Sequence, residues 1–161
     1  MLDLFSGLGG ASSAFRDRGW TVITVDADPA LKPDIVADLC GWHWAGGPVD
    51  LLWASPPCTE FSRWSMPWFK KVIPDMRCVQ AVYRLVAEIR PTHWILENVK
   101  GAVPWLGPPA QRFGAVYLWG EFPLVLANDC FWKERLSGTQ PALRAKVPYE
   151  LSDRIAASIT P

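Results

Sequence analysis

The start of the chain carries the pattern that most limits how it can fold: a short apolar strand, a glycine-rich turn and a helix. Residues 1–5 predict the strand, residues 6–10 (Ser-Gly-Leu-Gly-Gly) the turn, and residues 11–18 a helix that stops at Gly19. Open α/β sheets bind nucleotides at such a turn, because glycines let the backbone approach a ligand and the helix N-terminus favours negative groups. The turn lacks the Gly-Lys-Ser/Thr sequence of a Walker phosphate loop. Taken alone, it is equally compatible with an ordinary tight turn.

Two further strand-like segments, residues 21–25 and 34–37, each lead to an aspartate, Asp26 and Asp38. Asp26 follows the glycines by about 20 residues, the distance at which this architecture places a carboxylate on ribose hydroxyls. A carboxylate at Asp38 could accept a hydrogen bond from an adenine amino group. Each aspartate could also be a turn former or helix cap. Their joint position after successive strands favours a nucleoside site.

A cysteine follows the next predicted strand, residues 50–54. Pro56 and Pro57 stiffen the exit of that strand, because each fixes its own φ and restricts the preceding residue. Cys58 is therefore presented on a rigid loop, where a thiolate would be a strong nucleophile. A single cysteine is more often a small buried hydrophobic residue, so this motif needs support from the rest of the chain.

A carboxylate follows the strand after that. Residues 75–90 predict an amphipathic helix that stops at Pro91, and residues 93–96 predict a buried strand ending at Glu97. In a parallel sheet the ends of these strands share one edge, where ligands bind. Glu97 is a candidate acid with a raised pKa, or else a structural carboxylate that caps the next turn.

Together these motifs resemble those of the cytosine-C5 DNA methyltransferases, which use S-adenosylmethionine. Residues 3–10 look like the cofactor-binding motif of that family, residues 56–58 like its catalytic cysteine motif, and residues 97–99 like its glutamate motif. Gln111-Arg112 partly resembles the later glutamine–arginine motif. Val147-Pro148 resembles the final motif, whose helix, expected here over residues 149–159, completes the cofactor pocket. The ordered set covers nearly the whole chain.

The resemblance implies an α/β fold of the Rossmann-like S-adenosylmethionine-dependent methyltransferase class, with a mainly parallel sheet flanked by helices. It also implies transfer of a methyl group to C5 of cytosine in DNA, with S-adenosylmethionine as cofactor. The implied catalytic residues are Cys58, Glu97 and Arg112. The implied cofactor-binding residues are Phe5, Gly7, Leu8, Gly9, Gly10, Asp26, Asp38, Leu39, Pro56 and Val147.

The chemistry of the family explains these residue types. Cytosine C5 is too weak a nucleophile to take a methyl group directly, so the resemblance implies that Cys58 adds to C6 and makes C5 enamine-like. Glu97 would hydrogen-bond or protonate N3 and stabilise the developing charge. The implied partner is DNA whose target cytosine is flipped out of the duplex or already single-stranded.

The chain also departs from the family pattern. The family has arginines two and four residues after its glutamine, where this chain has Phe113 and Ala115, with Arg112 displaced by one position. The aromatic residue that normally follows the ribose acid is Ala27 here. Glu60 lies two residues after Cys58 and would raise the pKa of the thiol if it faced the sulfur.

The segment that normally holds a target-recognition domain is short. Only about 20 residues lie between Gly120 and Ala142, too few for a second core. We therefore expect one methyltransferase catalytic domain over residues 1–161, with the recognition domain absent or reduced to about 121–141. Three alternatives remain open: a specificity subunit that supplies recognition, a cofactor- or DNA-binding subunit with weak catalysis that needs a partner, and the same chemistry on RNA.

The charge balance is neutral, with 16 Lys+Arg and 16 Asp+Glu among the 161 residues. Nucleic-acid-binding proteins usually carry a basic surplus, but a local basic face is compatible with neutrality. The basic residues after the cysteine motif could contact phosphates or lie on a solvated loop: Arg63, Lys70, Lys71 and Arg77. Trp64 and Trp68 could stack on bases or anchor this loop.

Apolar runs, cysteines and prolines give further expectations about the class of protein and its location. No apolar run reaches the roughly 18 residues of a membrane span, and no signal peptide precedes the first strand. The four cysteines form no Cys-x-x-Cys pair, so we expect neither a metal site nor a disulfide framework. A cytoplasmic location would keep a working thiol reduced. The proline-rich stretches 103–109 and 141–148 predict ordered loops beside the sheet.

Overall fold

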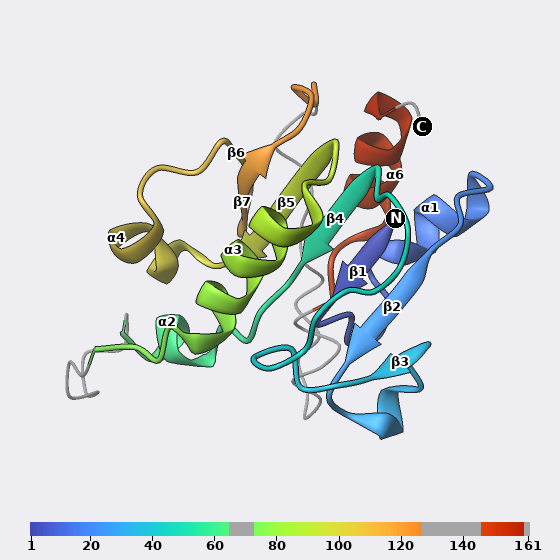
Figure 1. Cartoon of the computed structure of the whole chain (residues 1–161). Helices are drawn as coiled ribbons and strands as arrows, with labels where there is room; N and C mark the ends of the chain where they lie inside the picture. Colours follow the sequence, from blue (N-terminus) through green and yellow to red (C-terminus); the bar gives the residue numbers. More distant parts are fainter. Residues whose placement is uncertain (65–72, 127–145, 160–161) are drawn as a thin grey trace.

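The computed structural model describes residues 1–64, 73–126 and 146–159, and its centre is a mostly parallel β-sheet (Figure 1). Within these ranges the sheet has seven strands in the order β3-β2-β1-β4-β5-β7-β6. The strands are β1 (Leu2–Leu4), β2 (Ile23–Asp26), β3 (Ile35–Val36), β4 (Leu51–Ala54), β5 (His93–Asn98), β6 (Gln111–Phe113) and β7 (Val116–Glu121). Strands β1 to β5 pair in parallel, whereas β7 runs antiparallel to both β5 and β6.

Helices cover both faces of this sheet. On one face α1 (Ser12–Asp17) packs beside α6 (Tyr149–Ser158), and α3 (Arg77–Ile89) crosses the other face. The shorter helical segments are η1 (Pro29–Leu31), α2 (Thr59–Trp64), η2 (Lys100–Ala102) and α4 (Val103–Leu106). The arrangement is a three-layer α/β fold, so the predicted Rossmann-like α/β class with a mainly parallel, helix-flanked sheet is confirmed.

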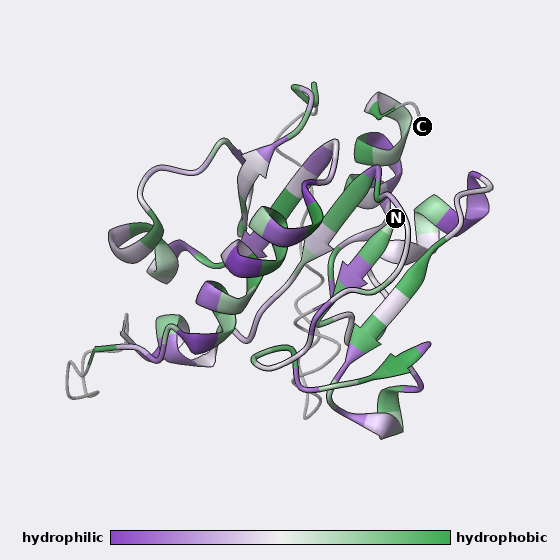
Figure 2. Cartoon of the chain, viewed as in Figure 1, coloured by the Kyte–Doolittle hydropathy of each residue, from purple (hydrophilic) through white to green (hydrophobic). Residues whose placement is uncertain are grey.

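Two apolar cores, one on each face, hold the layers together. Side chains alternate along a strand, so Trp53 faces the α1 and α6 core, whereas its neighbour Leu52 faces the α3 core. The central strands are therefore hydrophobic on both faces, as Figure 2 shows for β4. Helix α3 contributes Val79, Val82 and Leu85, each at most 2% exposed. Burying one such side chain fully contributes roughly 1.5–3 kcal/mol.

Most of the predicted elements lie within a few residues of the observed ones: β1 to β5, α1, α3 and α6. Two predictions were wrong in detail. The strand expected over 93–96 and ending at Glu97 extends one residue further, to Asn98. The stretch 103–109, expected as a loop, begins with the short helix α4. The hairpin formed by β6 and β7 was not predicted at all.

The expected reduced recognition segment, about 121–141, lies mostly outside the described residues, because the description stops at Leu126 and resumes at Lys146. In the described parts of the chain, no helix is both long enough and apolar enough to cross a membrane. The same residues contain no group of three or more His, Cys, Asp and Glu side chains arranged to hold a metal ion.

Candidate active site

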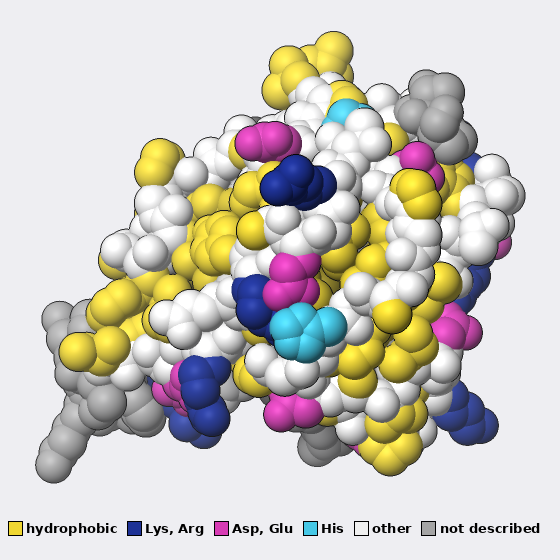
Figure 3. All heavy atoms as spheres, viewed as in Figure 1, with side chains coloured by type: hydrophobic (Ala, Val, Ile, Leu, Met, Phe, Trp, Pro, Cys, Tyr) yellow, Lys and Arg dark blue, Asp and Glu magenta, His cyan; other side chains and the backbone are white. Residues whose placement is uncertain are grey.

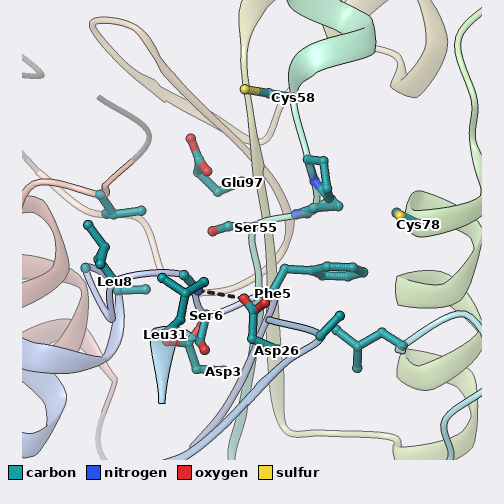
Figure 4. A pocket seen from close by; sticks show the side chains of 18 of the residues that line it. Asp3, Phe5, Ser6, Leu8, Asp26, Leu31, Ser55, Cys58, Cys78 and Glu97 are labelled. Carbon is teal, nitrogen blue, oxygen red and sulfur yellow. Dashed lines mark hydrogen bonds between the residues drawn. The ribbon is translucent and has the colours of Figure 1, made fainter. Parts of the chain in front are cut away.

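The carboxyl ends of the parallel strands open into a cavity of about 360 Å³. Ligands bind at this edge in open α/β sheets, and the volume is within the range of small-molecule pockets. Cys58 and Glu97, predicted as catalytic, both line the cavity. So do nine of the ten predicted cofactor-binding residues: Phe5, Gly7, Leu8, Gly10, Asp26, Asp38, Leu39, Pro56 and Val147. The structure therefore brings residues from separate sequence motifs to one cavity (Figure 4).

Asp26 fastens the glycine turn after β1 to the end of β2. The backbone N–H of Gly7 donates to Asp26 Oδ2 at 2.9 Å, and the N–H of Asp28 donates to Oδ1 at 3.0 Å. Each carboxylate oxygen can accept more than one hydrogen bond. Asp26 therefore holds the turn in place and keeps acceptor capacity for a ligand in the cavity that it lines.

The glycine turn fits closely against the segment that precedes α6. A Cβ at Gly10 would lie 2.7 Å from the backbone N of Val147 and 2.8 Å from its O, so only glycine fits there without a backbone shift. Val147 is buried and lines the cavity next to the glycine turn. The segment that precedes α6 therefore forms the wall of the cavity at this turn. Phe5, the first residue after β1, has a φ of +54°, a left-handed conformation that is uncommon for a non-glycine residue.

A tight turn after β3 positions the second predicted acid. Asp38 Oδ1 accepts a hydrogen bond from the N–H of Cys40 at 3.0 Å, which makes an Asx turn. Leu39, between them, is 1% exposed and packs in the α3 core with Leu52 and Leu85. The turn is thus anchored by an apolar side chain, while Asp38 remains exposed at the edge of the cavity.

The cysteine loop is held at both ends. The N–H of Ser55 donates to the carbonyl of Leu4 at 3.1 Å, which continues the pairing of β4 with β1. At the other end the carbonyl of Cys58 accepts from the N–H of Ser62 at 2.8 Å, so the cysteine immediately precedes the first turn of α2. Asn98 Nδ2 donates to the carbonyl of Pro56 at 3.1 Å in a buried bond, which ties the loop to β5.

Glu97 comes from the strand next to the cysteine loop. It is 5% exposed, and it lines the cavity on the same side as Cys58, with Ser55 below it in the view of Figure 4. The adjacent residue Asn98 forms the bond to Pro56 described above, so one strand end both presents the carboxylate and positions the loop of the thiol. A thiol and a partly desolvated carboxylate beside one cavity can act as nucleophile and acid on a bound ring.

One charged residue of the site, Asp3, was part of the predicted cofactor motif but was not named as a site residue. It lies on the central strand β1, is 1% exposed, and lines the cavity. Neither carboxylate oxygen has a hydrogen-bond partner among the described residues. Burial raises the pKa of Asp3 to about 7, partly offset by nearby Ser12 and Arg16. In the sequence, Leu2 and Leu4 indicate a buried strand. An acidic residue between them is unusual in such a strand, and this was the signal that could have identified Asp3 as a functional residue.

Two predicted residues lie outside the cavity lining. Gly9 stays within the turn, where its N–H donates to the carbonyl of Ser6 at 2.9 Å. Arg112 lies on the exposed side of β6, where its Nε donates to the carbonyl of Gly114 at 3.2 Å and its guanidinium lies 5.3 Å from the centre of the Tyr117 ring. The structure therefore does not bring Arg112 together with Cys58 and Glu97.

The charged residues near the cysteine loop form pairs with each other. Arg63 lies 3.6 Å from Glu60, and Arg77 lies 2.7 Å from Asp75. The carboxylate of Glu60, two residues after Cys58, is the partner of Arg63 in this ion pair. The other residues considered for nucleic-acid contact, Lys70, Lys71, Trp68 and the side chain of Trp64, lie outside the described residues.

The fold and the cavity define a class: a Rossmann-like α/β domain with a candidate site at the carboxyl edge of its mostly parallel sheet. No protein-family profile matches the chain. A stretch of 68 residues, 39% of the chain, is 37% identical to the "Probable DNA (cytosine-5)-methyltransferase" of Frog virus 3 (isolate Goorha) and covers 30% of that protein. This similarity confirms the predicted resemblance to the DNA cytosine-5 methyltransferase family.

A solved structure is also similar: the crystal structure of a candidate DNA modification methyltransferase encoded within a prophage (E. coli). It is 25% identical, with a TM-score of 0.49, over 63% of this chain and 32% of the other. The chain thus spans less than a third of the length of each of these two proteins.

Proposed function

We propose that the chain is a DNA cytosine-C5 methyltransferase domain that uses S-adenosylmethionine. The observation that carries the proposal is the convergence of Cys58, Glu97, the glycine turn and two strand-end acids on one cavity of about 360 Å³. The similarity to the Frog virus 3 protein supports the same family.

The described residues fit the cofactor. S-adenosylmethionine has an adenine, a ribose, a carboxylate, an ammonium group and a sulfonium, so it needs acceptors for hydroxyl and amino groups. Asp26 would accept from the ribose and Asp38 from the adenine. The buried, unpartnered carboxylate of Asp3 would accept from the ammonium group, which would satisfy a polar group that is otherwise costly to bury. When bound, the cofactor supplies an electrophilic methyl group.

The remaining cavity residues would act on the base. The thiolate of Cys58 would add to C6 of cytosine, and Glu97 would hydrogen-bond to N3, so that electron density moves to C5. After C5 is methylated, loss of the C5 proton and expulsion of the thiolate would restore the ring and the free cysteine. Asn98 would position the cysteine through its bond to the Pro56 carbonyl. A reducing compartment such as the cytoplasm would keep this thiol available.

Recognition of DNA belongs to the proposal as well. The cytosine would enter the cavity flipped out or single-stranded. Sequence readout requires side chains that reach base edges, and Arg112, the predicted contact from the glutamine–arginine motif, is held at β6 by Gly114 and Tyr117. We infer that a specificity subunit supplies much of the recognition.

The test is covalent trapping on DNA that contains 5-fluorocytosine, in the presence of S-adenosylmethionine, because fluorine cannot leave as the C5 proton does. The wild-type chain should form a complex that survives denaturing electrophoresis. The variant Cys58→Ser should form none, whereas Cys78→Ser, a matched change in the other thiol that lines the cavity, should still be trapped.

Trapping of the Cys58→Ser variant would show that another residue attacks the base. If wild type is trapped on neither DNA nor RNA and transfers no labelled methyl group even with a candidate partner protein, the proposed function is wrong. Trapping on RNA that contains 5-fluorocytosine, but not on DNA, would show that the substrate of the same reaction is RNA.

A further inference from the structure

A charged cluster on the outer side of α3 connects this helix to the turn that carries Asp38. Figure 3 shows basic, acidic and histidine side chains meeting on this face of the molecule. Arg84, in the middle of α3, donates through NH1 to Glu88 Oε1 at 3.0 Å and lies 3.2 Å from His43 Nδ1. Glu88 in turn lies 3.1 Å from His43.

The other end of the Arg84 guanidinium contacts the backbone of the turn. Its NH2 donates to the carbonyl of Leu39 at 3.0 Å and to the carbonyl of Trp42 at 2.8 Å. Both bonds are long-range in sequence and partly buried. The planar guanidinium thus bonds to two carbonyls and a carboxylate at once, a geometry that the single ammonium group of a lysine cannot reproduce.

The residues held in this way are those at the adenine end of the proposed site. Leu39 lines the cavity, and its neighbour Asp38 is fixed by the N–H of Cys40, inside the same turn. A second observation supports the link: Cys78 on α3 lines the same cavity as Asp38 and Leu39, so the helix and the turn border one ligand space. The position of the Asp38 carboxylate therefore depends on how this turn is attached to α3.

We propose that Arg84 is a positioning residue for base recognition in the cofactor: it holds the 38–42 turn so that Asp38 can accept from the exocyclic amino group of adenine. The proposal rests on the proposed function, because it presumes that the cavity binds an adenosyl cofactor. It concerns discrimination between bases, which is separate from overall affinity and from the chemistry at Cys58.

The test compares two ligands by titration calorimetry: S-adenosylhomocysteine and S-inosylhomocysteine, in which a carbonyl replaces the exocyclic amino group. Wild type should prefer the adenosyl ligand by roughly 10- to 100-fold, the value of a hydrogen bond to a charged group. Arg84→Gln should reduce this preference to about threefold or less, as should Asp38→Ala, and the double variant should lose little more than either single one.

Two further variants separate positioning from stability. Arg90→Gln removes the same charge from an exposed side chain at the C-terminal end of α3, and it should keep the full preference. Arg84→Lys keeps the charge and should fold even if Arg84→Gln does not. Its preference for the adenosyl ligand over the inosyl ligand should be weaker than that of wild type and stronger than that of Asp38→Ala. Thermal unfolding monitors all variants.

An equal loss of affinity for both ligands in the Arg84 variants, with the preference unchanged, would overturn the proposal and leave Arg84 a purely structural role. Unchanged affinities in both Arg84 variants would overturn it too. If wild type binds neither ligand, the cofactor assignment itself is wrong and the positioning role is overturned with it. If wild type binds both equally, the adenine role of Asp38 fails while cofactor binding stands.

Discussion

The two halves of the site are held by different kinds of contact. The proposed cofactor half, meaning the glycine turn with Asp26 and Asp38, is fixed by its two carboxylates, which accept from backbone N–H groups: Asp26 from Gly7 at 2.9 Å and Asp38 from Cys40 at 3.0 Å. The proposed catalytic half, meaning Cys58 and Glu97, depends on contacts between separate segments. Its links are the bond from Asn98 to Pro56 and the contact of α2 with η2.

This difference suggests that the two halves can be damaged separately. If the proposed function is right, changes in the proposed cofactor half should reduce ligand affinity, because they would displace the acceptors assigned to the ligand. Changes in the catalytic half should slow methyl transfer and leave cofactor affinity nearly intact. The predictions below test this separation, and a variant that affects both properties equally would count against it.

The largest effect is expected at the catalytic half, in Glu97→Gln. The amide keeps the shape of the side chain but cannot donate a proton to N3, so methyl transfer should slow by roughly two to four powers of ten. Cofactor affinity by calorimetry should stay within about twofold of wild type. Glu121→Gln, an isosteric change at the exposed end of β7, should alter neither value. Near-normal turnover of Glu97→Gln would remove this residue from the mechanism.

A pair of glycine variants gives the sharpest comparison of the two halves. In Gly10→Ala the new Cβ would lie 2.7 Å from the backbone N of Val147, and in Gly101→Ala it would lie 2.1 Å from the carbonyl O of Phe61 in α2. Overpacking of this kind costs about 1–3 kcal/mol, roughly a 5- to 150-fold effect. Gly10→Ala should lose cofactor affinity, whereas Gly101→Ala should shift α2 and slow transfer.

Both glycine variants need a check by circular dichroism that they fold. Loss of affinity in Gly101→Ala to the same extent as in Gly10→Ala would show that α2 and the glycine turn move as one unit. Full affinity in Gly10→Ala would mean that Val147 does not close the cofactor side of the cavity.

The sequence was most informative where local chemistry decides the structure. The strands β1 to β5 are short apolar runs, Asp26 ends β2 and Asp38 lies two residues after β3, so their place at the carboxyl edge could be inferred from a parallel arrangement alone. The hairpin of β6 and β7 could not, because β7 pairs antiparallel with both β5 and β6, and the choice of pairing partners is a non-local property.

Arg112 shows why a motif shifted by one position is difficult to interpret. Side chains alternate between the two faces of a strand, so a displacement by one residue moves a side chain to the opposite face. On β6 the neighbouring Phe113 is buried, whereas Arg112 is exposed and contacts the cross-strand Tyr117. Asp3 illustrates the converse: its type was visible in the sequence, but its burial depends on β2 and β4 flanking β1.

A separate effect, on stability, is expected from the pH dependence that Asp3 imposes on the proposed cofactor half. Burial raises the pKa of Asp3 to about 7, far above the usual value of about 3.9 for an unfolded aspartate. Between about pH 4 and 7 the folded chain therefore holds a proton that the unfolded chain has released. The free energy of unfolding should then fall as pH rises through this window, by at most about 1.4 kcal/mol per pH unit, and level off above it.

Urea unfolding from pH 4.5 to 8 measures this slope in wild type and in Asp3→Asn, whose amide does not titrate. The slope should be smaller in Asp3→Asn, whereas Asp17→Asn, at the exposed end of α1, should keep it. S-adenosylhomocysteine should bind wild type more tightly as Asp3 ionises near pH 7, because its ammonium group would pair with the carboxylate, and Asp3→Asn should lack this gain. Parallel pH profiles for wild type and Asp3→Asn, in both unfolding and binding, would show that Asp3 is not the titrating group and that the ammonium group binds elsewhere.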